Sequence, residues 1–143
     1  MVGIVIATHG DLANGFMDSI NIIMGSPENI SVATLKNDKG IEGFNVELRA
    51  SLNNVISDDG ILILSDIKGG TPYNSSCYYA GNGEFNVNIK VVSGINLPML
   101  LEVLSMREHS NLDELVKIAL NAGITGIDIP TPVDGSLEYE DEL

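Results

Sequence analysis

Short runs of apolar, often β-branched residues alternate along this chain with longer segments of helical period. Such alternation is typical of α/β proteins, in which each buried strand is followed by a helix that crosses back over the sheet. The first run, 2–7, contains only apolar residues and glycine, as expected for a parallel strand covered on both faces. The pattern predicts an α/β fold with an open, doubly wound, mainly parallel sheet and helices on both faces.

The order of the segments predicts the topology. A right-handed doubly wound sheet commonly has the strand order 2-1-3-4, with the first and third strands as neighbours. We expect one domain over residues 1–133. Within it we expect strands at 2–7, 30–35, 61–64, 87–92 and 126–129, and helices at 11–25, 41–56, 71–80, from 97 through at least 104, and at 112–122.

The charge balance limits the partners. The 143 residues include 7 Lys and Arg against 20 Asp and Glu, a net charge of −13, which repels nucleic acid and anionic lipid. Five of the acids follow residue 133, so residues 1–133, with 7 basic and 15 acidic side chains, carry −8. We expect the tail, 134–143, to be solvated and disordered.

Compartment and redox state follow from features that the sequence lacks. Its one cysteine, Cys77, allows no internal disulfide, and we expect it to be a small core residue of the third helix. The first residues have no positive region or cleavage site of a signal peptide, and no apolar run reaches eighteen residues. The prediction is a cytoplasmic protein.

Two candidate functional residues follow neighbouring predicted strands. His9 lies two residues past the first apolar run, and Asp66 comes just after the third. Since reactive groups of open α/β sheets gather at the carboxyl ends of the strands, the two side chains are expected to touch. A carboxylate that holds one imidazole nitrogen fixes the tautomer and leaves the other nitrogen with a free lone pair. His9 is therefore a candidate nucleophile and Asp66 the group that orients it.

A glycine-rich turn follows Asp66 and predicts an anion site. Gly69 and Gly70 let backbone approach a ligand, Thr71 offers a hydroxyl and a possible helix cap, and Pro72 suits a first helical turn. Free N–H groups and the helix dipole favour a phosphate-like group there. Together with His9, the turn suggests phosphoryl transfer through a phosphohistidine. Each part alone has another explanation, such as a structural histidine or an ordinary capped turn.

Other chemistries lack their motifs. The chain has no phosphate-loop or dinucleotide fingerprint, no serine-hydrolase elbow and no metal-ligand spacing around its two histidines, His9 and His109. We expect no cofactor and no metal. His109 is expected to be a surface residue, and Asp11 is expected to cap the first helix.

Three segments follow the first, third and fourth predicted strands and form a recognisable set. They are Thr8-His9-Gly10, Ser65-Asp66-Ile67-Lys68-Gly69-Gly70-Thr71-Pro72-Tyr73-Asn74 and Gly94-Ile95-Asn96-Leu97-Pro98-Met99-Leu100. With these segments the chain resembles the mannose-family IIA component of the bacterial phosphotransferase system. The likeness covers about residues 1–130, although that family commonly has tryptophan where this chain has Lys68.

The resemblance implies a phosphocarrier for uptake of a mannose-family sugar. Such a protein accepts phosphate from HPr on the histidine that matches His9 and passes it to the IIB component. It serves the membrane components IIC and IID indirectly and does not touch the sugar itself. Asp66 matches the orienting aspartate, and Thr71 matches the hydroxyl that contacts the phosphoryl group. The family also implies a homodimer in which the last strand, here 127–129, crosses to the partner's sheet as an antiparallel edge.

Two other functions stay open at this point. One is the related phosphotransfer subunit that serves dihydroxyacetone kinase, which shares the fold and the histidine but departs at residues 69–74. The other is a regulatory or binding module with an inactive site. Which sugar is transported cannot be read from the chain.

Overall fold

The apolar runs form one parallel sheet in the computed structural model, which describes residues 1–132. The strands are β1 (Gly3–His9), β2 (Ile30–Leu35), β3 (Ile61–Ser65) and β4 (Ile89–Val92). Every neighbouring pair is parallel and the order is β2-β1-β3-β4, which confirms the predicted topology. The carboxyl ends of β1 and β3 therefore lie side by side.

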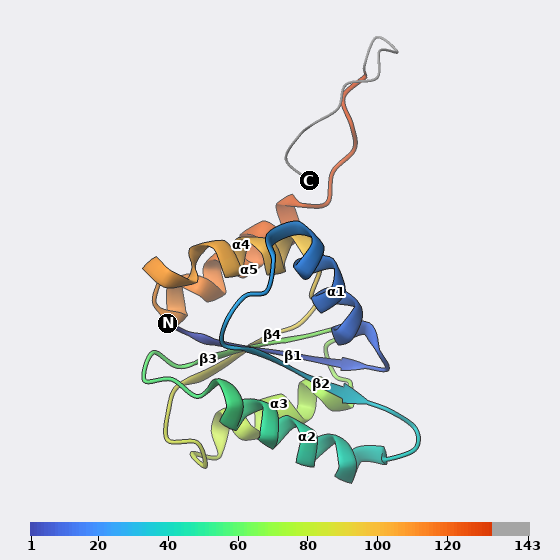
Figure 1. The fold of residues 1–143 in the computed structure, drawn as a ribbon, viewed down its shortest axis with the longest axis vertical. Coiled ribbons are helices and arrows are strands. Elements are labelled where there is room, and N and C mark those ends of the chain that lie inside the picture. The colour runs from blue at the N-terminus through green and yellow to red at the C-terminus, as the bar shows by residue number, and fades with distance from the viewer. Residues whose placement is uncertain (133–143) are drawn as a thin grey trace.

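Helices cover both faces of the sheet (Figure 1). Helices α1 (Leu12–Met24), α4 (Leu97–Met106) and α5 (Leu112–Thr125) lie on one face, with a short 3-10 helix, η1 (Arg107–His109), between the last two. Helices α2 (Gly40–Val55) and α3 (Thr71–Gly81) lie on the other. Alternate strand residues supply the two cores, because successive side chains of a strand point to opposite faces. None of the described helices is long and apolar enough to cross a membrane.

The edge of the sheet at β2 is covered by side chains of α2. Glu47 accepts hydrogen bonds from the backbone N–H of Thr34 at 3.0 Å and from its hydroxyl at 3.2 Å. Ser51 donates to the carbonyl of Val32 at 2.6 Å. These bonds occupy backbone groups that would otherwise pair with another strand. The edge at β4 lies at the opposite side of the sheet.

Two strand predictions need correction. β4 starts at Ile89 rather than residue 87, because the chain before it turns through Asn86, whose φ is +57°. The strand expected at 126–129 does not form in this chain: helical hydrogen bonds continue past α5, with Ile127 N–H donating to Ile124 at 3.2 Å. Exchange of this segment with a second copy stays a prediction. The predicted tail, 134–143, lies outside the described residues.

The prediction that Cys77 is a core residue is wrong. α3 buries Pro72, Ser76 and Tyr79, which recur at helical spacing on one face, and Cys77 falls on the exposed side. His109 is exposed, as predicted. Side chains cap the last two helices: Asn96 accepts from Met99 N–H, and Asn111 forms a capping box with Glu114.

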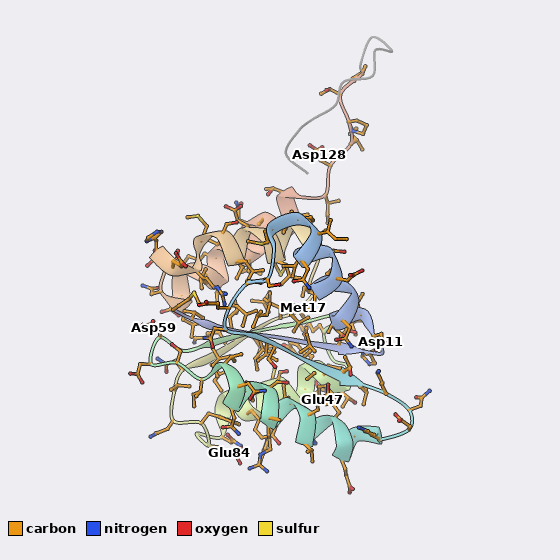
Figure 2. All side chains as sticks on the ribbon, viewed as in Figure 1. Asp11, Met17, Glu47, Asp59, Glu84 and Asp128 are labelled. Atoms are coloured by element: carbon orange, nitrogen blue, oxygen red, sulfur yellow. The ribbon has the colours of Figure 1, made fainter. Side chains whose placement is uncertain are left out.

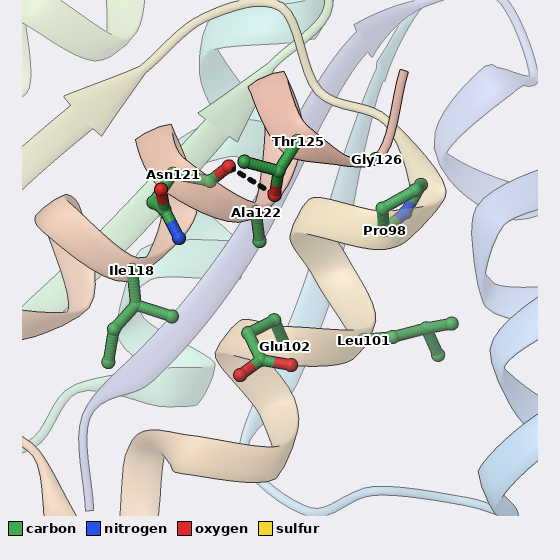
Figure 3. Close-up of a pocket in the computed structure, with 8 residues that line it drawn as sticks. All are labelled: Pro98, Leu101, Glu102, Ile118, Asn121, Ala122, Thr125 and Gly126. Atoms are coloured by element: carbon green, nitrogen blue, oxygen red, sulfur yellow. Dashed lines mark hydrogen bonds between the residues drawn. The ribbon is translucent and has the colours of Figure 1, made fainter. Parts of the chain in front are cut away.

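The side chains at the two ends of the sheet and on α1 can be located in Figure 2. Figure 2 shows Asp11 at the carboxyl end of the sheet, Asp59 at the opposite end, and Met17 of α1 turned toward the sheet. A groove of about 510 Å³ runs between α4 and α5, lined among others by Pro98 and Ile118 (Figure 3). None of its lining residues comes from the loops after β1 and β3, so it is separate from the candidate site.

Candidate functional site

His9 and Asp66 meet at the carboxyl end of the sheet. His9 is the last residue of β1, and Asp66 directly follows β3, whose Ser65 pairs with Ala7. His9 Nδ1 lies 2.8 Å from Asp66 Oδ2, and the backbone N–H of His9 donates to the same oxygen at 2.9 Å. The imidazole is 48% exposed and the carboxylate 12%. The aspartate thus sits behind the ring, which faces solvent.

Asp66 is held in its ionised form. Burial alone would raise the pKa of its carboxyl group. The hydrogen bonds from the backbone and ring of His9, the charge of His9 and the N–H of Ile67 at 2.9 Å outweigh burial, so the pKa is below its usual value. An ionised carboxylate can only accept hydrogen bonds, so the proton of this contact belongs to Nδ1 of the ring. With Nδ1 protonated, Nε2 is the ring nitrogen whose lone pair is available whenever the imidazole is uncharged.

Gly70 lies against the reactive side of the imidazole. A Cβ built on Gly70 would be 2.7 Å from His9 Cε1 and 3.3 Å from Nε2. The first distance is shorter than van der Waals contact allows, so only glycine fits without a shift of the ring or of the turn. The glycine predicted from sequence to admit a ligand therefore also admits the histidine.

The first turn of α3 points unpaired N–H groups out of its end. In residues 1–132, the N–H groups of Thr71 and Tyr73 donate to no protein acceptor, and Pro72 has none to donate. The N–H of Gly70 makes a long bond of 3.3 Å to Ile67. Gly70, not Thr71, is the N-cap residue, so the expected side-chain cap is absent and the hydroxyl of Thr71 is left for other contacts. Such an end favours an anion.

Sequence reasoning assigned the first helix cap to the wrong residue. Asp11 makes no cap bond; its carboxylate pairs with Lys36 at 2.8 Å. Thr8, fully buried, accepts instead from the N–H of Ala13 at 2.9 Å and so holds the turn that follows His9. The feature of the sequence from which this bond could have been predicted is a threonine near the end of an apolar strand. Gly69 and Lys68 are exposed in the loop before α3.

The chain is similar to known proteins in both sequence and structure. A family model described as "PTS system fructose IIA component" matches residues 3–120. This chain belongs to that family, EIIA-man. It is 32% identical over 116 residues to the fructose-specific EIIA component of Bacillus subtilis (strain 168), covering 81% of this chain and 77% of the relative.

Other EIIA-man relatives are longer or have solved structures. The mannose-specific EIIAB component of Escherichia coli (strain K12) is 30% identical over 127 residues, which are 88% of this chain but 38% of that protein. The EIIA crystal structure from Streptococcus agalactiae superposes with a TM-score of 0.81 at 31% identity, covering 90% of this chain and 97% of that one. The mannose/sorbose-specific IIA subunit from Enterococcus faecalis superposes with a TM-score of 0.77 at 26% identity, covering 92% of this chain and 98% of that one. The chain is a component of the phosphotransferase system.

Within residues 1–132, no group of three or more His, Cys, Asp and Glu side chains gathers as metal ligands. The arrangement offers an imidazole held by a carboxylate beside a helix end with free N–H groups.

Proposed function

We propose that this chain is a phosphocarrier of a sugar phosphotransferase system, which takes a phosphoryl group from HPr on Nε2 of His9 and passes it to a IIB component. The observation that carries the proposal is the 2.8 Å contact between His9 Nδ1 and Asp66, which leaves Nε2 without a protein partner on a ring that is 48% exposed. The names of the relatives, fructose-, mannose- and sorbose-specific, favour a role in uptake of a sugar of this class, and we expect the chain to act in the cytoplasm.

In the proposed step, the lone pair of Nε2 attacks phosphorus while the bond from phosphorus to the donor histidine breaks. The bonding electrons return to the donor ring, and the negative charge of the phosphoryl oxygens persists throughout. Asp66 stabilises the positive charge that develops on the His9 ring. The N–H and the hydroxyl of Thr71 receive the oxygens, together with the N–H of Gly70, whose bond to Ile67 is long at 3.3 Å. In transfer to IIB the same step is repeated with His9 as the leaving group: a nucleophile of IIB attacks phosphorus, the bond to Nε2 breaks, and its electrons return to the His9 ring.

Catalysis here consists mainly of alignment. The transition state of phosphoryl transfer is loose and requires in-line geometry and charge stabilisation more than covalent assistance. The net charge of −8 on residues 1–133 speeds the encounter with a donor whose docking face is basic. We expect added salt to slow the first transfer.

We also propose that the chain forms a homodimer by exchange of residues 127–129. Ile127 and Ile129 are 77% and 83% exposed, and the edge at β4 is available for an added strand, whereas the β2 edge is covered. Light scattering after size-exclusion chromatography tests this: the wild type should have the mass of two chains, and Ile129→Asp that of one. A monomeric wild type at micromolar concentration contradicts the exchange.

The central test is transfer of label from radioactive phosphoenolpyruvate through enzyme I and HPr. We expect the wild type to take label that is lost in acid and kept in base, as for a phosphohistidine. His9→Gln should take none while unfolding as the wild type does. His109→Gln is the matched control, because it removes the other histidine of the chain, and it should be labelled normally. Adding a IIB component should then move the label onto IIB.

Two results would contradict the proposal. A folded wild type that takes no label indicates a regulatory or binding module. A chain that takes label and passes it to a dihydroxyacetone kinase system but to no sugar-specific IIB component indicates the related phosphotransfer subunit.

A further inference from the structure

Few contacts hold the turn that precedes α3. Gly69 has φ of +86°, and a Cβ built there would touch nothing within 4 Å, so side-chain packing does not fix this backbone. Three hydrogen bonds hold the backbone of Gly69 and Gly70 in the described part of the chain. Gly70 N–H donates to Ile67 at 3.3 Å, and Asn74 N–H donates to the Gly70 carbonyl at 2.9 Å. The third is a side-chain bond, from Asn74 Nδ2 to the Gly69 carbonyl at 3.0 Å.

The bond from the Asn74 side chain fixes more than one carbonyl. The carbonyl of Gly69 and the N–H of Gly70 belong to one planar peptide group, and the chain has no cis peptide bond among its described residues. In a trans peptide the two groups point in opposite directions. Fixing the carbonyl therefore fixes the direction of the Gly70 N–H, on the residue that lies against His9 Cε1 and Nε2.

This turn has little else to resist rotation. Neither glycine has a Cβ, so the peptide group between them rotates more freely than a peptide group flanked by residues with side chains. Without the side-chain bond, the N–H of Gly70 is held by a 3.3 Å bond alone. In residues 1–132 no other side chain bonds to the backbone of Gly69 or Gly70.

We propose that Asn74 is a positioning residue for phosphoryl transfer: its side-chain amide locks the Gly69–Gly70 peptide and so keeps the backbone of Gly70 against the His9 ring, with the start of α3 in place to receive a phosphoryl group on His9. The inference rests on the proposed function, since it names what aligns the anion-binding turn of the same site. Asn74 itself does not receive phosphate and acts through the Gly69 carbonyl.

The test compares Asn74→Ala with Ser75→Ala, a neighbour on α3 whose side chain makes no hydrogen bond among the described residues. Asn74→Gln, which keeps the amide on a stem one methylene longer, tests for partial rescue. For each variant we would measure kcat and KM for phosphorylation by phospho-HPr, the unfolding free energy, and the amide NMR shifts of Gly69 and Gly70 in the unphosphorylated protein.

We expect Asn74→Ala to lower kcat about three- to tenfold, the net worth of one ordinary hydrogen bond, with little change in KM. Stability should change little, because alanine is the better helix former and offsets the lost bond. The Gly69 and Gly70 amide signals should shift or broaden. Ser75→Ala should match the wild type, and Asn74→Gln should recover part of kcat.

The outcomes separate the two proposals. A wild type that is never phosphorylated overturns the proposed function, whatever the NMR spectra show. A phosphorylated wild type with Asn74→Ala equal to Ser75→Ala in kcat overturns the role of Asn74 alone. Loss of rate that merely follows loss of stability also counts against positioning.

Discussion

One oxygen of Asp66, Oδ2, lies within hydrogen-bond distance of both the backbone N–H and the ring Nδ1 of His9, at 2.9 and 2.8 Å. The two bonds tie the main chain and the ring of the histidine to the same atom. Rotation of the imidazole about its side-chain torsions would break one contact while leaving the other. The ring is thereby pre-oriented before any phosphoryl donor arrives, which lowers the cost of reaching the in-line geometry.

Asp66→Asn should weaken both phosphorylation and the pH dependence of stability. In the folded protein the pKa of Asp66 is below its usual value, so the ionised carboxylate stabilises the folded state. This stabilisation is fully present above the ordinary aspartate pKa of about 4, and it is lost as the pH falls through the lower pKa of the folded state. We expect about 1–3 kcal/mol less stability at pH 7 and a smaller loss on acidification than the wild type shows. Urea unfolding at pH 7 and pH 3 measures both. Parallel acid curves for the two proteins would contradict the assignment.

Gly70→Ala should damage the site by crowding. The added methyl group would lie 2.7 Å from His9 Cε1, so the ring or the turn must move, at about 1–3 kcal/mol. Labelling by phospho-HPr should fall at least tenfold. Gly15→Ala is the control, because a Cβ there meets nothing within 4 Å in α1, and it should stabilise the protein by about 0.5–1 kcal/mol. Equal labelling of the two variants would argue against the close approach.

Arg107→Ala should be strongly destabilising although it is far from the site in sequence. Arg107 is 4% exposed and donates to the carbonyls of Val2, Glu28 and Asn29, joining η1 to the start of β1 and to the loop before β2. Burial lowers the pKa of its guanidinium group. Removing it loses the hydrogen bonds of a charged group and the packing of a buried side chain, for an expected loss of about 2–4 kcal/mol in chemical denaturation.

A second arginine serves as the comparison for Arg107. Arg49 is exposed and pairs with Glu84 at 3.1 Å, so Arg49→Ala should lower the free energy of unfolding by less than about 1 kcal/mol. Similar losses for both variants would show that burial does not set the cost.

Ser65→Ala should leave the protein as stable as before or make it up to about 1 kcal/mol more stable. Ser65 is fully buried at the end of β3, and its hydroxyl has no hydrogen-bond partner among the described residues. Replacing an unpaired polar atom with hydrogen removes a desolvation penalty. Thermal unfolding and labelling by phospho-HPr provide the readouts. A loss of 1 kcal/mol or more would mean that the hydroxyl has a partner.

The order of apolar runs and helical segments was sufficient to predict the strand order and the pairing of His9 with Asp66. These features depend on local periodicity and on the right-handed crossover, both of which a single chain displays in its pattern. The likeness in three motifs pointed to the family that the comparisons then established. Roles assigned to Gly69, Gly70 and Thr71 remain predictions for experiment.

Only the tertiary structure decided which groups meet across loops. That Thr8 rather than Asp11 caps α1, that Cys77 faces outward, and that Gly70 lies against the His9 ring follow from how elements far apart in the chain pack. His9 and Asp66 are 57 residues apart in the chain. Which nitrogen of the His9 ring contacts Asp66 depends on where the register of β1 against β3 places the two side chains. Local sequence encodes faces and turns, whereas contacts of a few ångströms between loops are set by the packing of the whole sheet.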